Sequence, residues 1–293
     1  MNQRIGIIGL GVMGTAMSGH LLKAGYEVHG YDVVDDRNAD LTARGGTAHS
    51  SGAGVAEASD VVLLSLPSVA ALHAATEDVV AGAHEGLIAA DMGVLPIEEK
   101  EKAKARFADV GVELMDVQVS GTGLQAADAT LVVMASGSQE AFDATRAVFD
   151  VVGRSTHYLG PFPNGSIMKY IANLLVAIHN LSSAEAHAMG IAAGMDPETV
   201  QKVISDGVGS SRIFEIRGPM MAADNYEPPS ARLDIIKKDA GIIQGFARSV
   251  GAPTPLLDTA LSVYQEASSA GLGDLDAAAL CRHLERLGGI ERQ

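Results

Sequence analysis

Six residues near the start of the chain limit its fold more than any other feature. Gly9-Leu10-Gly11-Val12-Met13-Gly14 has the form G-x-G-x-x-G, follows the apolar run Arg4–Ile8 and opens the helical pattern Met13–Lys23. A strand before the motif and a helix after it form the context that dinucleotide binding requires. Gly9 permits the tight turn, Gly11 lets the backbone approach a pyrophosphate, and Gly14 lets helix and strand pack closely. The helix N-terminus supplies N–H groups for phosphates.

Asp32 ends a second apolar run, Glu27–Tyr31, and follows the glycines at about the 20-residue interval expected of a ribose-binding carboxylate. A carboxylate accepts hydrogen bonds from both ribose hydroxyls and repels a 2′-phosphate, so Asp32 favours NAD over NADP. Arg37 lies nearby in the sequence and can hold such a phosphate, which keeps NADP as the alternative. The alternative to a nucleotide site is that these residues form only a glycine-rich turn followed by a loop aspartate.

The first half of the chain alternates short apolar runs with stretches of helical spacing such as Ile97–Ala108. This alternation predicts a mainly parallel sheet covered on both faces. Loops at the carboxyl ends of such strands face the nucleotide, so Leu66 and Pro67 are candidate cofactor contacts; a structural turn is the alternative. The candidate strands are Arg4–Ile8, Glu27–Tyr31, Val61–Ser65, Leu87–Ala90, Val112–Asp116, Thr130–Ala135 and Thr156–Leu159.

The pattern changes at the proline-containing turn Gly160–Asn164. From Ser166 to Ala193 no proline occurs, and apolar residues recur at three- and four-residue steps, which indicates a long helix with one buried stripe. Every strong signal after it is helical. We therefore expect an α/β dinucleotide-binding domain over residues 1–162 and an all-helical domain over residues 163–293 that begins with the long helix.

Capping signals mark the ends of several expected helices. Asn164 and Asp274 are candidate N-caps for the long helix and the last helix. Asp196-Pro197 and Thr254-Pro255 each combine an N-cap residue with proline at the first helical position. Three glycines follow apolar-periodic stretches and suit helix ends, namely Gly194, Gly251 and Gly271.

The composition limits the partners of the chain. Lys and Arg number 21 against 36 Asp and Glu, which gives a formal net charge of -15. Such a surface repels nucleic acid and anionic lipid, so local groups must bind an anionic substrate. The single cysteine, Cys281, excludes an internal disulfide framework and fits a reducing cytoplasm. No apolar run has the length of a transmembrane helix, so we expect no membrane span.

The segment Ile7–His20 contains residues that dinucleotide binding does not demand, among them Met13, Met17 and Ser18. With these residues the segment resembles the N-terminal signature of the 3-hydroxyisobutyrate dehydrogenase family of β-hydroxyacid dehydrogenases. Tartronate semialdehyde reductase, L-threonate dehydrogenase and, more distantly, 6-phosphogluconate dehydrogenase belong to the same group. The resemblance implies an NAD(P)-dependent enzyme with a Rossmann-type domain, a long connecting helix and an all-α second domain.

Three later blocks agree with this family in order and spacing. Asp116–Thr122 resembles its substrate-binding D-A-P-V-S-G-G, and Gly165–Asn173 resembles its catalytic G-x-x-x-K-x-x-N-N. Lys238-Asp239 resembles a Lys-Asp pair whose lysine reaches the cofactor. The resemblance thereby implies one catalytic residue, Lys169, the substrate-binding residues Ser120, Gly121, Thr122 and Asn173, and the cofactor-binding residue Lys238.

Several positions depart from the family's pattern. Thr122 replaces the second glycine of S-G-G, and Ala172 replaces the first asparagine after the lysine. Gly93 and Val94 stand where many members have Ser and Thr beside the nicotinamide ribose, which makes Val94 a candidate cofactor contact. Lys169 is intact, so the reaction class is unaffected, while 3-hydroxyisobutyrate-, threonate- and glycerate-like substrates all stay open. Two later glycines of the substrate block are replaced by Gln125 and Ala129.

Oxidation of an alcohol by NAD requires removal of the hydroxyl proton, a hydride that faces the nicotinamide, and a substrate held in that pose. Lys169, if buried beside a positively charged nicotinamide, has a reason to lose its proton and act as general base, and as general acid in the reverse reaction. Asn173, one helical turn later, points the same way and can orient the alcohol. The turn Ser120–Thr122 can bind a carboxylate as an anion nest; a plain Ser-Gly turn is the alternative.

Other interpretations of these residues stay open. Lysine is mostly exposed in proteins, so Lys169 can be a solvated charge. An imine reductase shares the architecture but lacks this lysine, and a non-catalytic nucleotide-binding relative has no need of it. Arg212 is either a ligand of the substrate carboxylate or a surface residue. Asp234, Lys237 and Asp239 have the pattern of a solvated helical face. The spacing of the histidines predicts no metal site, and the apolar helical second half resembles the family's association surfaces, which favours a homodimer or homotetramer.

Overall fold

The computed structural model describes residues 3–292. It divides into two compact units, Met1–Lys169 (unit 1) and Tyr170–Gln293 (unit 2). The division falls inside one long helix, α8 (Asn164–Ala192), whose first residues belong to unit 1 and whose remainder belongs to unit 2. The expected domain boundary between residues 162 and 163 lies just before the start of this helix.

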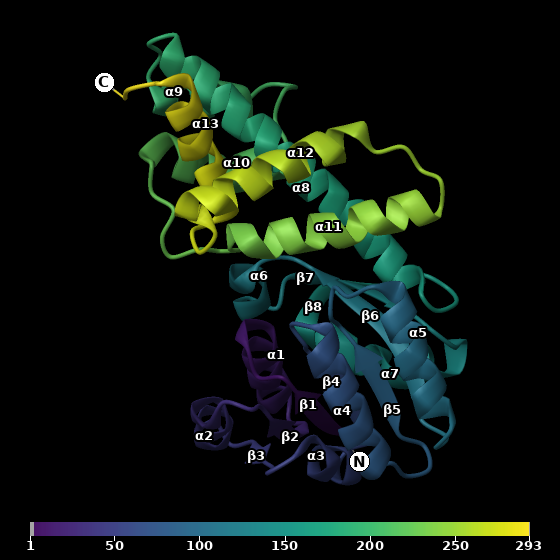
Figure 1. Cartoon of the computed structure of the whole chain (residues 1–293). Helices are drawn as coiled ribbons and strands as arrows, with labels where there is room; N and C mark the ends of the chain where they lie inside the picture. Colours follow the sequence, from purple (N-terminus) through teal and green to yellow (C-terminus); the bar gives the residue numbers. More distant parts are fainter. Residues whose placement is uncertain (1–2, 293) are drawn as a thin grey trace. The chain divides into compact units, whose positions relative to one another are not determined.

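Unit 1 contains an eight-stranded sheet with the order β3-β2-β1-β4-β5-β6-β7-β8 (Figure 1). Neighbouring strands run parallel except β6 and β7, which are antiparallel. The expectation of a mainly parallel sheet is confirmed. The strands are β1 (Arg4–Ile8), β2 (Glu27–Tyr31), β3 (Thr47–Ala48), β4 (Val61–Leu64), β5 (Ile88–Asp91), β6 (Glu113–Ser120), β7 (Leu131–Ser136) and β8 (Gly153–Tyr158).

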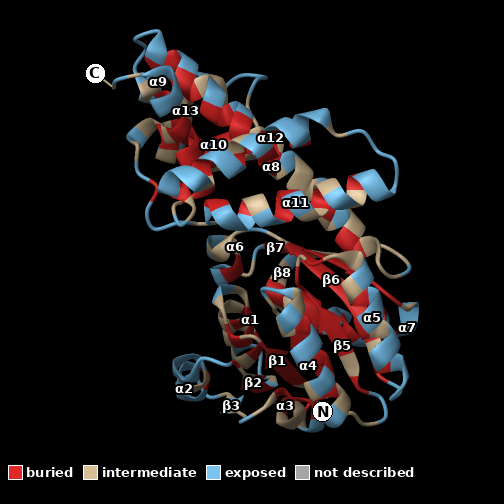
Figure 2. Cartoon of the chain, in the orientation of Figure 1, coloured by how far each residue is buried: buried red, intermediate tan, exposed pale blue. Residues whose placement is uncertain are grey.

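Helices cover both faces of this sheet, and each face has its own apolar cluster. Residues of α1, α2, α6 and α7 join the first cluster, and residues of α3, α4 and α5 join the second. Figure 2 shows the strands buried and the outward faces of these helices exposed. The helices are α1 (Val12–Lys23), α2 (Asp35–Ala43), α3 (Gly52–Ala58), α4 (Val69–Ala81), α5 (Ile97–Ala108), α6 (Gly123–Ala127) and α7 (Gln139–Val152).

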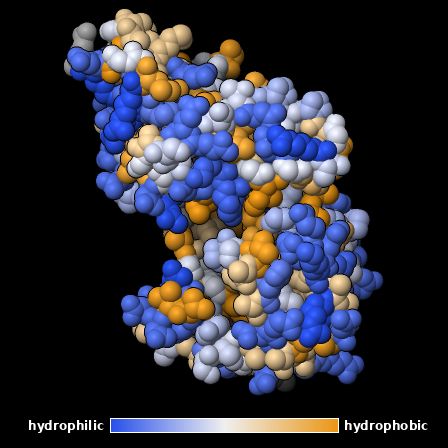
Figure 3. All heavy atoms as spheres, viewed as in Figure 1, coloured by the Kyte–Doolittle hydropathy of each residue, from blue (hydrophilic) through white to orange (hydrophobic). Residues whose placement is uncertain are grey.

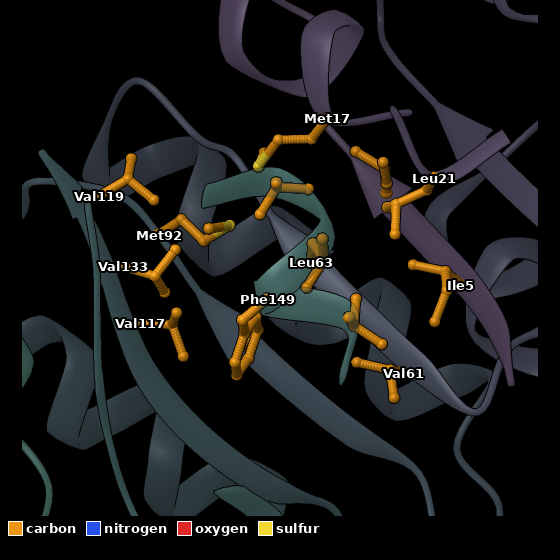
Figure 4. Packing of buried hydrophobic residues seen from close by; sticks show 14 of the residues in the cluster. Ile5, Met17, Leu21, Val61, Leu63, Met92, Val117, Val119, Val133 and Phe149 are labelled. Atoms are coloured by element: carbon orange, nitrogen blue, oxygen red, sulfur yellow. The ribbon is translucent and has the colours of Figure 1, made fainter. Parts of the chain in front are cut away.

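The run Val61–Leu64 shows why the strands have continuous apolar sequences. All of its residues are buried, and successive side chains of a strand point to opposite faces. Val61 and Leu63 pack in the first cluster, whereas Val62 and Leu64 pack in the second. In the first cluster, labelled side chains from β1, β4, β6, β7 and the helices α1 and α7 point toward one another (Figure 4). A strand covered on both sides must be apolar throughout.

Unit 2 is built from helices. Asp196 caps α9 as expected, since its carboxylate accepts the Thr199 N–H and Pro197 is the first helical residue. Gly194, with φ +77°, lies just after α8, which it ends as expected. After α8 come α9 (Pro197–Ser205), α10 (Arg212–Ala223), α11 (Leu233–Ser249), α12 (Pro255–Ala267), the single turns η1 (Ser268–Leu272) and η2 (Ala277–Ala279), and α13 (Leu280–Gly288).

Two expected N-caps are wrong. The Ile167 N–H bonds to the carbonyl of Pro163, so helical bonding in α8 starts before Asn164, whose side chain instead donates to Leu159 O at 2.7 Å. At the other end of the chain Asp276, not Asp274, is the N-cap of the helical turn η2, and its side chain accepts the Ala278 N–H. Thr254 does precede α12, but its side chain makes no capping hydrogen bond.

The expected strands and helices agree with the structure where the apolar pattern is long. Arg4–Ile8, Glu27–Tyr31 and the helix Ile97–Ala108 have the expected bounds. Strand β3 was not expected, because two residues are too few to form a pattern. Strand β6 extends to Ser120, four residues beyond the expected end, because this extension pairs with β7.

The surface of the face shown in Figure 3 is mostly hydrophilic, with hydrophobic residues in separate patches. Among the described residues two exposed valines are notable, since Val12 and Val33 flank the expected nucleotide site with 73% and 84% of their surface accessible. Within residues 3–292 no helix is both long and apolar enough to cross a membrane.

Candidate active site

The sheet of unit 1 has one point at which its strand order reverses. The chain adds β2 and β3 on one side of β1, and β4 and all later strands on the other side. Ligands of doubly wound sheets bind outside the carboxyl ends of the strands at such a point. The glycine turn follows β1, Asp32 follows β2, and Leu66 follows β4. The predicted residues of unit 1 thus lie where such a sheet binds ligands.

The three glycines of the turn differ in what a side chain would meet. A Cβ at Gly9, which has φ +95°, would overlap the carbonyl of Ser65, and a Cβ at Gly14 would overlap the carbonyl of Gly9. Both glycines are therefore required by the packing of the turn itself. A Cβ at Gly11 would meet no atom within 4 Å. The open space above Gly11 is the space that a bound pyrophosphate would need.

The start of α1 presents further backbone donors. In any α-helix the N–H groups of the first turn have no acceptor within the helix, which here concerns Val12 and Met13. The N–H of Leu10 instead donates to Asp32 Oδ2 at 2.7 Å. Leu10 thus links the glycine turn to the candidate ribose-binding residue, and the exposed Val12 stands at the edge of the turn.

Asp32 is almost fully buried and its carboxylate has several donors. Besides Leu10, the Val34 N–H donates to Oδ1 at 2.9 Å, and Arg37 Nη1 lies 3.2 Å from Oδ1 and 3.1 Å from Oδ2. The side chain of Asn38 holds the backbone of Asp32 on both sides, accepting its N–H and donating to its carbonyl. The carboxylate is therefore rigidly placed and carries a guanidinium partner.

The loops after β4 and β5 lie next to each other. A Cβ at Gly93 would stand 3.1 Å from the carbonyl of Leu66, so glycine allows the two loops to approach closely. Gly93 also donates its N–H to Asp91 Oδ1 at 3.1 Å. Pro67 is exposed and Val94 half-buried. Leu66, Pro67 and Val94 thus belong to neighbouring loops.

The substrate block Ser120–Thr122 ends β6 and lies against the glycine turn. A Cβ at Gly123 would stand 3.0 Å from Cγ1 of Val12, so the start of α6 touches the start of α1. Gly121 has φ +149°, a conformation that side chains rarely adopt. The N–H of Thr122 donates to Gln125 Oε1 at 2.6 Å. One amide of the expected anion nest is therefore occupied by Gln125, the third residue of α6.

Lys169 lies in the part of α8 that belongs to unit 1 and is half-buried. It follows Gly165 and Ser166, whose N–H groups donate to Ser136 Oγ at 2.9 Å and Asp116 Oδ2 at 2.5 Å. The first turn of this helix is thus bound to β6 and β7, the strands that lead into and out of the substrate block.

In unit 2 the structure brings Asn173 and the Lys-Asp pair together. Asn173 Nδ2 donates to Asp239 Oδ2 at 3.0 Å, and Lys238 Nζ lies 3.1 Å from Asp239 Oδ1. The interpretation of Asp239 as part of a solvated face is wrong, because only 6% of the residue is exposed. It belongs to the apolar stripe of α11, where a charge pattern alone suggests an exposed face.

Arg212 and the histidines have other surroundings. Arg212 is exposed and pairs with Glu215 at 2.8 Å on the first turn of α10. His187 is buried with its ring stacked on Phe214, and burial lowers its pKa. No group of three or more His, Cys, Asp or Glu residues in the described part of the chain is arranged to hold a metal ion.

Unit 1 also contains a buried charge cluster that was not predicted from the sequence. Lys100 on α5 lies between Asp91 and Asp116 with all three side chains inaccessible to solvent. One signal was present in the sequence: Lys100, Ala103 and Phe107 share one face of their helix, and that face is the buried one.

Family models match both halves of the chain. Residues 4–160 match the NAD binding domain of 6-phosphogluconate dehydrogenase. Residues 164–284 match a family described as NAD-binding of NADP-dependent 3-hydroxyisobutyrate dehydrogenase. The first match covers more than half of the chain, including the glycine turn and the substrate block.

Curated and solved relatives extend over nearly the whole length. An L-threonate dehydrogenase of Cupriavidus necator is 33% identical over 290 residues, which cover 96% of each chain. A 2-(hydroxymethyl)glutarate dehydrogenase of Eubacterium barkeri is 29% identical and aligns with 98% of this chain and 96% of its own length. The crystal structure of a 3-hydroxyisobutyrate dehydrogenase from Salmonella typhimurium, 29% identical, superposes with a TM-score of 0.88 over 96% of this chain and 100% of that one.

Proposed function

Since the chain belongs to the 3-hydroxyisobutyrate dehydrogenase family, we propose that it uses NAD to oxidise the hydroxyl of a small β-hydroxy acid, or to reduce the matching semialdehyde or keto acid. Membership of this family makes the protein an NAD(P)-dependent oxidoreductase. The preference for NAD, the substrate class and the roles of individual residues are what we propose. The observation that carries it is the packing of α6, which directly follows the substrate block, against α1, which follows the glycine turn.

The residues of unit 1 fit a dinucleotide. The open space at Gly11 and the first-turn donors of α1 suit a pyrophosphate, and the buried Asp32 suits a ribose. Leu66, Pro67 and Val94 follow the next strands and would line the nicotinamide half. The nicotinamide, when bound, accepts or gives the hydride. By family resemblance we assign Lys238 to the cofactor as well.

Lys169 is proposed as the catalytic residue. Its neutral amine takes the proton of the substrate hydroxyl, and its ammonium returns that proton in the reverse reaction. Ser120 and Gly121, with Thr122, hold the substrate carboxylate through a hydroxyl and backbone N–H groups. Asn173 already donates its Nδ2 to Asp239, so its carbonyl oxygen is the atom that can accept from the alcohol or the ammonium.

The experiment combines a substrate panel with variants of Lys169. C3–C5 hydroxy acids are supplied with NAD or NADP, and reduced nicotinamide is followed by its absorbance. Lys169→Ala should lower kcat/KM by about 10²–10⁴-fold, the usual cost of losing a general base, with NAD affinity nearly unchanged. Lys169→Arg should not restore activity, because a guanidinium does not deprotonate at working pH.

The matched control is Lys102→Ala, an exposed lysine of α5 that pairs with Glu99. Its activity should equal that of the wild type. If Lys169→Ala keeps more than about a tenth of wild-type kcat/KM, which is above what the loss of a base permits, Lys169 is not the base. Activity with none of the hydroxy acids would overturn the proposed substrate class.

A further inference from the structure

Three charged side chains are buried together in unit 1, outside the residues assigned above. Lys100 Nζ lies 3.0 Å from Asp91 Oδ2 and 2.8 Å from Asp116 Oδ1, and each side chain has 0% of its surface exposed. Asp91 and Asp116 stand opposite each other in the parallel strands β5 and β6. Burial of charge is costly even when the charges are paired, so this cluster needs an explanation.

Stability does not supply that explanation. Two carboxylates share one ammonium, and apolar side chains of similar volume often stabilise a core as well as a buried ion pair does. Burial raises the pKa of the Asp91 carboxyl. Burial also acts against the Lys100 ammonium, but the two carboxylates outweigh it and raise the pKa of Lys100. The ammonium therefore stays charged, and the cluster persists as an ionic group within the sheet layer.

Asp116 binds the start of the helix that carries Lys169. The Ser166 N–H donates to Asp116 Oδ2 at 2.5 Å, and Ser166 Oγ donates to Oδ1 at 2.8 Å. A Cβ at Gly165 would stand 2.5 Å from the carbonyl of Asp116, so only glycine lets the helix approach this closely. Gly165, the glycine of the G-x-x-x-K block, is therefore required by packing, because a side chain there would keep the start of α8 away from Asp116.

Asp91 binds the loop that follows β5. The Gly93 N–H donates to Asp91 Oδ1 at 3.1 Å. The side chain of Gln118, one strand away, donates to the Gly93 carbonyl at 3.2 Å and to Asp116 Oδ1 at 3.1 Å. The Gly93 backbone is therefore held by Asp91 of the cluster and by Gln118, which itself donates to Asp116 of the cluster.

We infer that Lys100, Asp91 and Asp116 form a positioning cluster that sets the place of Lys169 relative to the Gly93–Val94 loop. Lys100 joins the two carboxylates, one of which holds the first turn of α8 and the other the loop proposed to lie beside the nicotinamide. Lys169 follows Ser166 by three residues, so a shift of this turn moves the lysine with it. The inference rests on the proposed role of Lys169, and the three cluster residues act through it without touching substrate.

Ser166→Ala tests this inference with little risk to folding, because it removes one hydroxyl and keeps the backbone hydrogen bond to Asp116. We expect kcat to fall about tenfold to 100-fold, since small misplacements of reacting groups cost up to about 10²-fold. The KM for NAD should change less than about threefold, because among the described residues Ser166 makes no hydrogen bond to those assigned to the nucleotide. Asp116→Asn removes the charge and keeps the shape. It should likewise lower kcat and change the KM for NAD little.

The matched control is Ser138→Ala. Ser138 also begins a helix of unit 1, and its hydroxyl accepts the Ala141 N–H of α7. Each variant removes one serine hydroxyl at the start of a helix of unit 1, although Ser166 donates to a carboxylate and Ser138 accepts a backbone N–H. A purely structural role for Ser166 predicts that any loss of kcat in either variant follows its loss of thermal midpoint. The positioning role predicts that only Ser166→Ala loses kcat.

Two measurements together separate slower chemistry from loss of folded enzyme: the NAD-binding stoichiometry, and the deuterium isotope effect on kcat with substrate deuterated at the hydroxyl-bearing carbon. Slower chemistry raises the isotope effect or keeps it at its full value, while the NAD-binding stoichiometry stays at one per chain. Unfolding lowers the stoichiometry and leaves the isotope effect of the remaining enzyme unchanged. Equal kcat in Ser166→Ala and Ser138→Ala, or a kcat loss matched by lost NAD sites, would overturn the inference. The Lys169→Ala measurement does not depend on the result for Ser166→Ala, and it tests the proposed function alone.

Discussion

The side chain of Gln125 accepts the backbone N–H of Thr122 at 2.6 Å. Both residues replace glycines of the family's substrate block, so the two departures are physically linked. A glycine in place of Gln125 would leave this N–H to a ligand, and here it is bound by Gln125 at the start of α6. The contact also closes the first turn of α6, where the Thr122 carbonyl accepts the Ala126 N–H at 3.0 Å.

Gln125→Ala should therefore strengthen binding of a carboxylate substrate. The freed N–H can donate to the carboxylate, and one hydrogen bond to a charged group contributes about 1.5–3 kcal/mol before the loss of loop order is subtracted. We expect KM for the acid to fall about threefold to tenfold, with the KM of the corresponding methyl ester unchanged. Gln139→Ala on the exposed start of α7 is the control. A KM for the acid that rises would mean that loop order outweighs the extra donor.

Arg37 should govern how well NADP is tolerated. Its guanidinium compensates the charge of Asp32, which weakens the repulsion of a 2′-phosphate, and it can also pair with that phosphate. Arg37→Ala should lower kcat/KM for NADP about tenfold or more, the worth of one charged hydrogen bond, and change the value for NAD much less. Arg146→Ala, an exposed arginine on α7, should change neither. Wild-type preference for NADP would refute the choice of NAD.

The chain should associate with itself. Ile171 and Leu175, one turn apart on α8, are exposed in unit 2, and Met189 is exposed further along the same helix. Exposed apolar side chains on one helix are typical of an association surface. Light scattering at micromolar concentration should give two or four times the chain mass of 30.2 kDa. A particle of the single-chain mass would contradict the expectation of a homodimer or homotetramer.

The glycine turn and Asp32 could be predicted because their chemistry is local. A tight turn, a helix start and a carboxylate at a set interval are all visible in one short stretch of sequence. Strand β4 could be predicted for the same reason, because burial on both faces makes its sequence apolar throughout.

The positioning cluster could not be predicted in this way. Asp91 and Asp116 meet only because β5 and β6 pair in one register, and Lys100 reaches them from a helix between the two in sequence. The burial of Asp239 likewise depends on which face of α11 packs inward. Contacts of these kinds arise from tertiary packing, which local residue patterns do not encode.

Asp276 should make unit 2 sensitive to acid. It is fully buried and accepts hydrogen bonds from Ser230, from the Ala231 and Ala278 N–H groups, and from Arg217 Nε at 3.2 Å. Burial alone would raise the pKa of this carboxyl, but Arg217 and the other donors outweigh burial and lower it. The folded state thus favours the ionised form. The resulting stability is present above the unfolded pKa of 3.8 and is lost as pH falls through the lower folded value.

Asp276→Asn removes the charge and leaves Arg217 buried without its carboxylate. Breaking a buried pair in this way costs about 3–5 kcal/mol, so the urea midpoint at pH 7 should fall clearly. The difference between wild type and variant should stay constant from pH 7 to pH 5 and shrink below about pH 4, because only the wild type then loses its ionised carboxylate. Asp274→Asn, two residues earlier and exposed, should differ little from wild type at any pH. A gap between wild type and Asp276→Asn that stays the same down to pH 3 would show that the charge of Asp276 does not stabilise the fold.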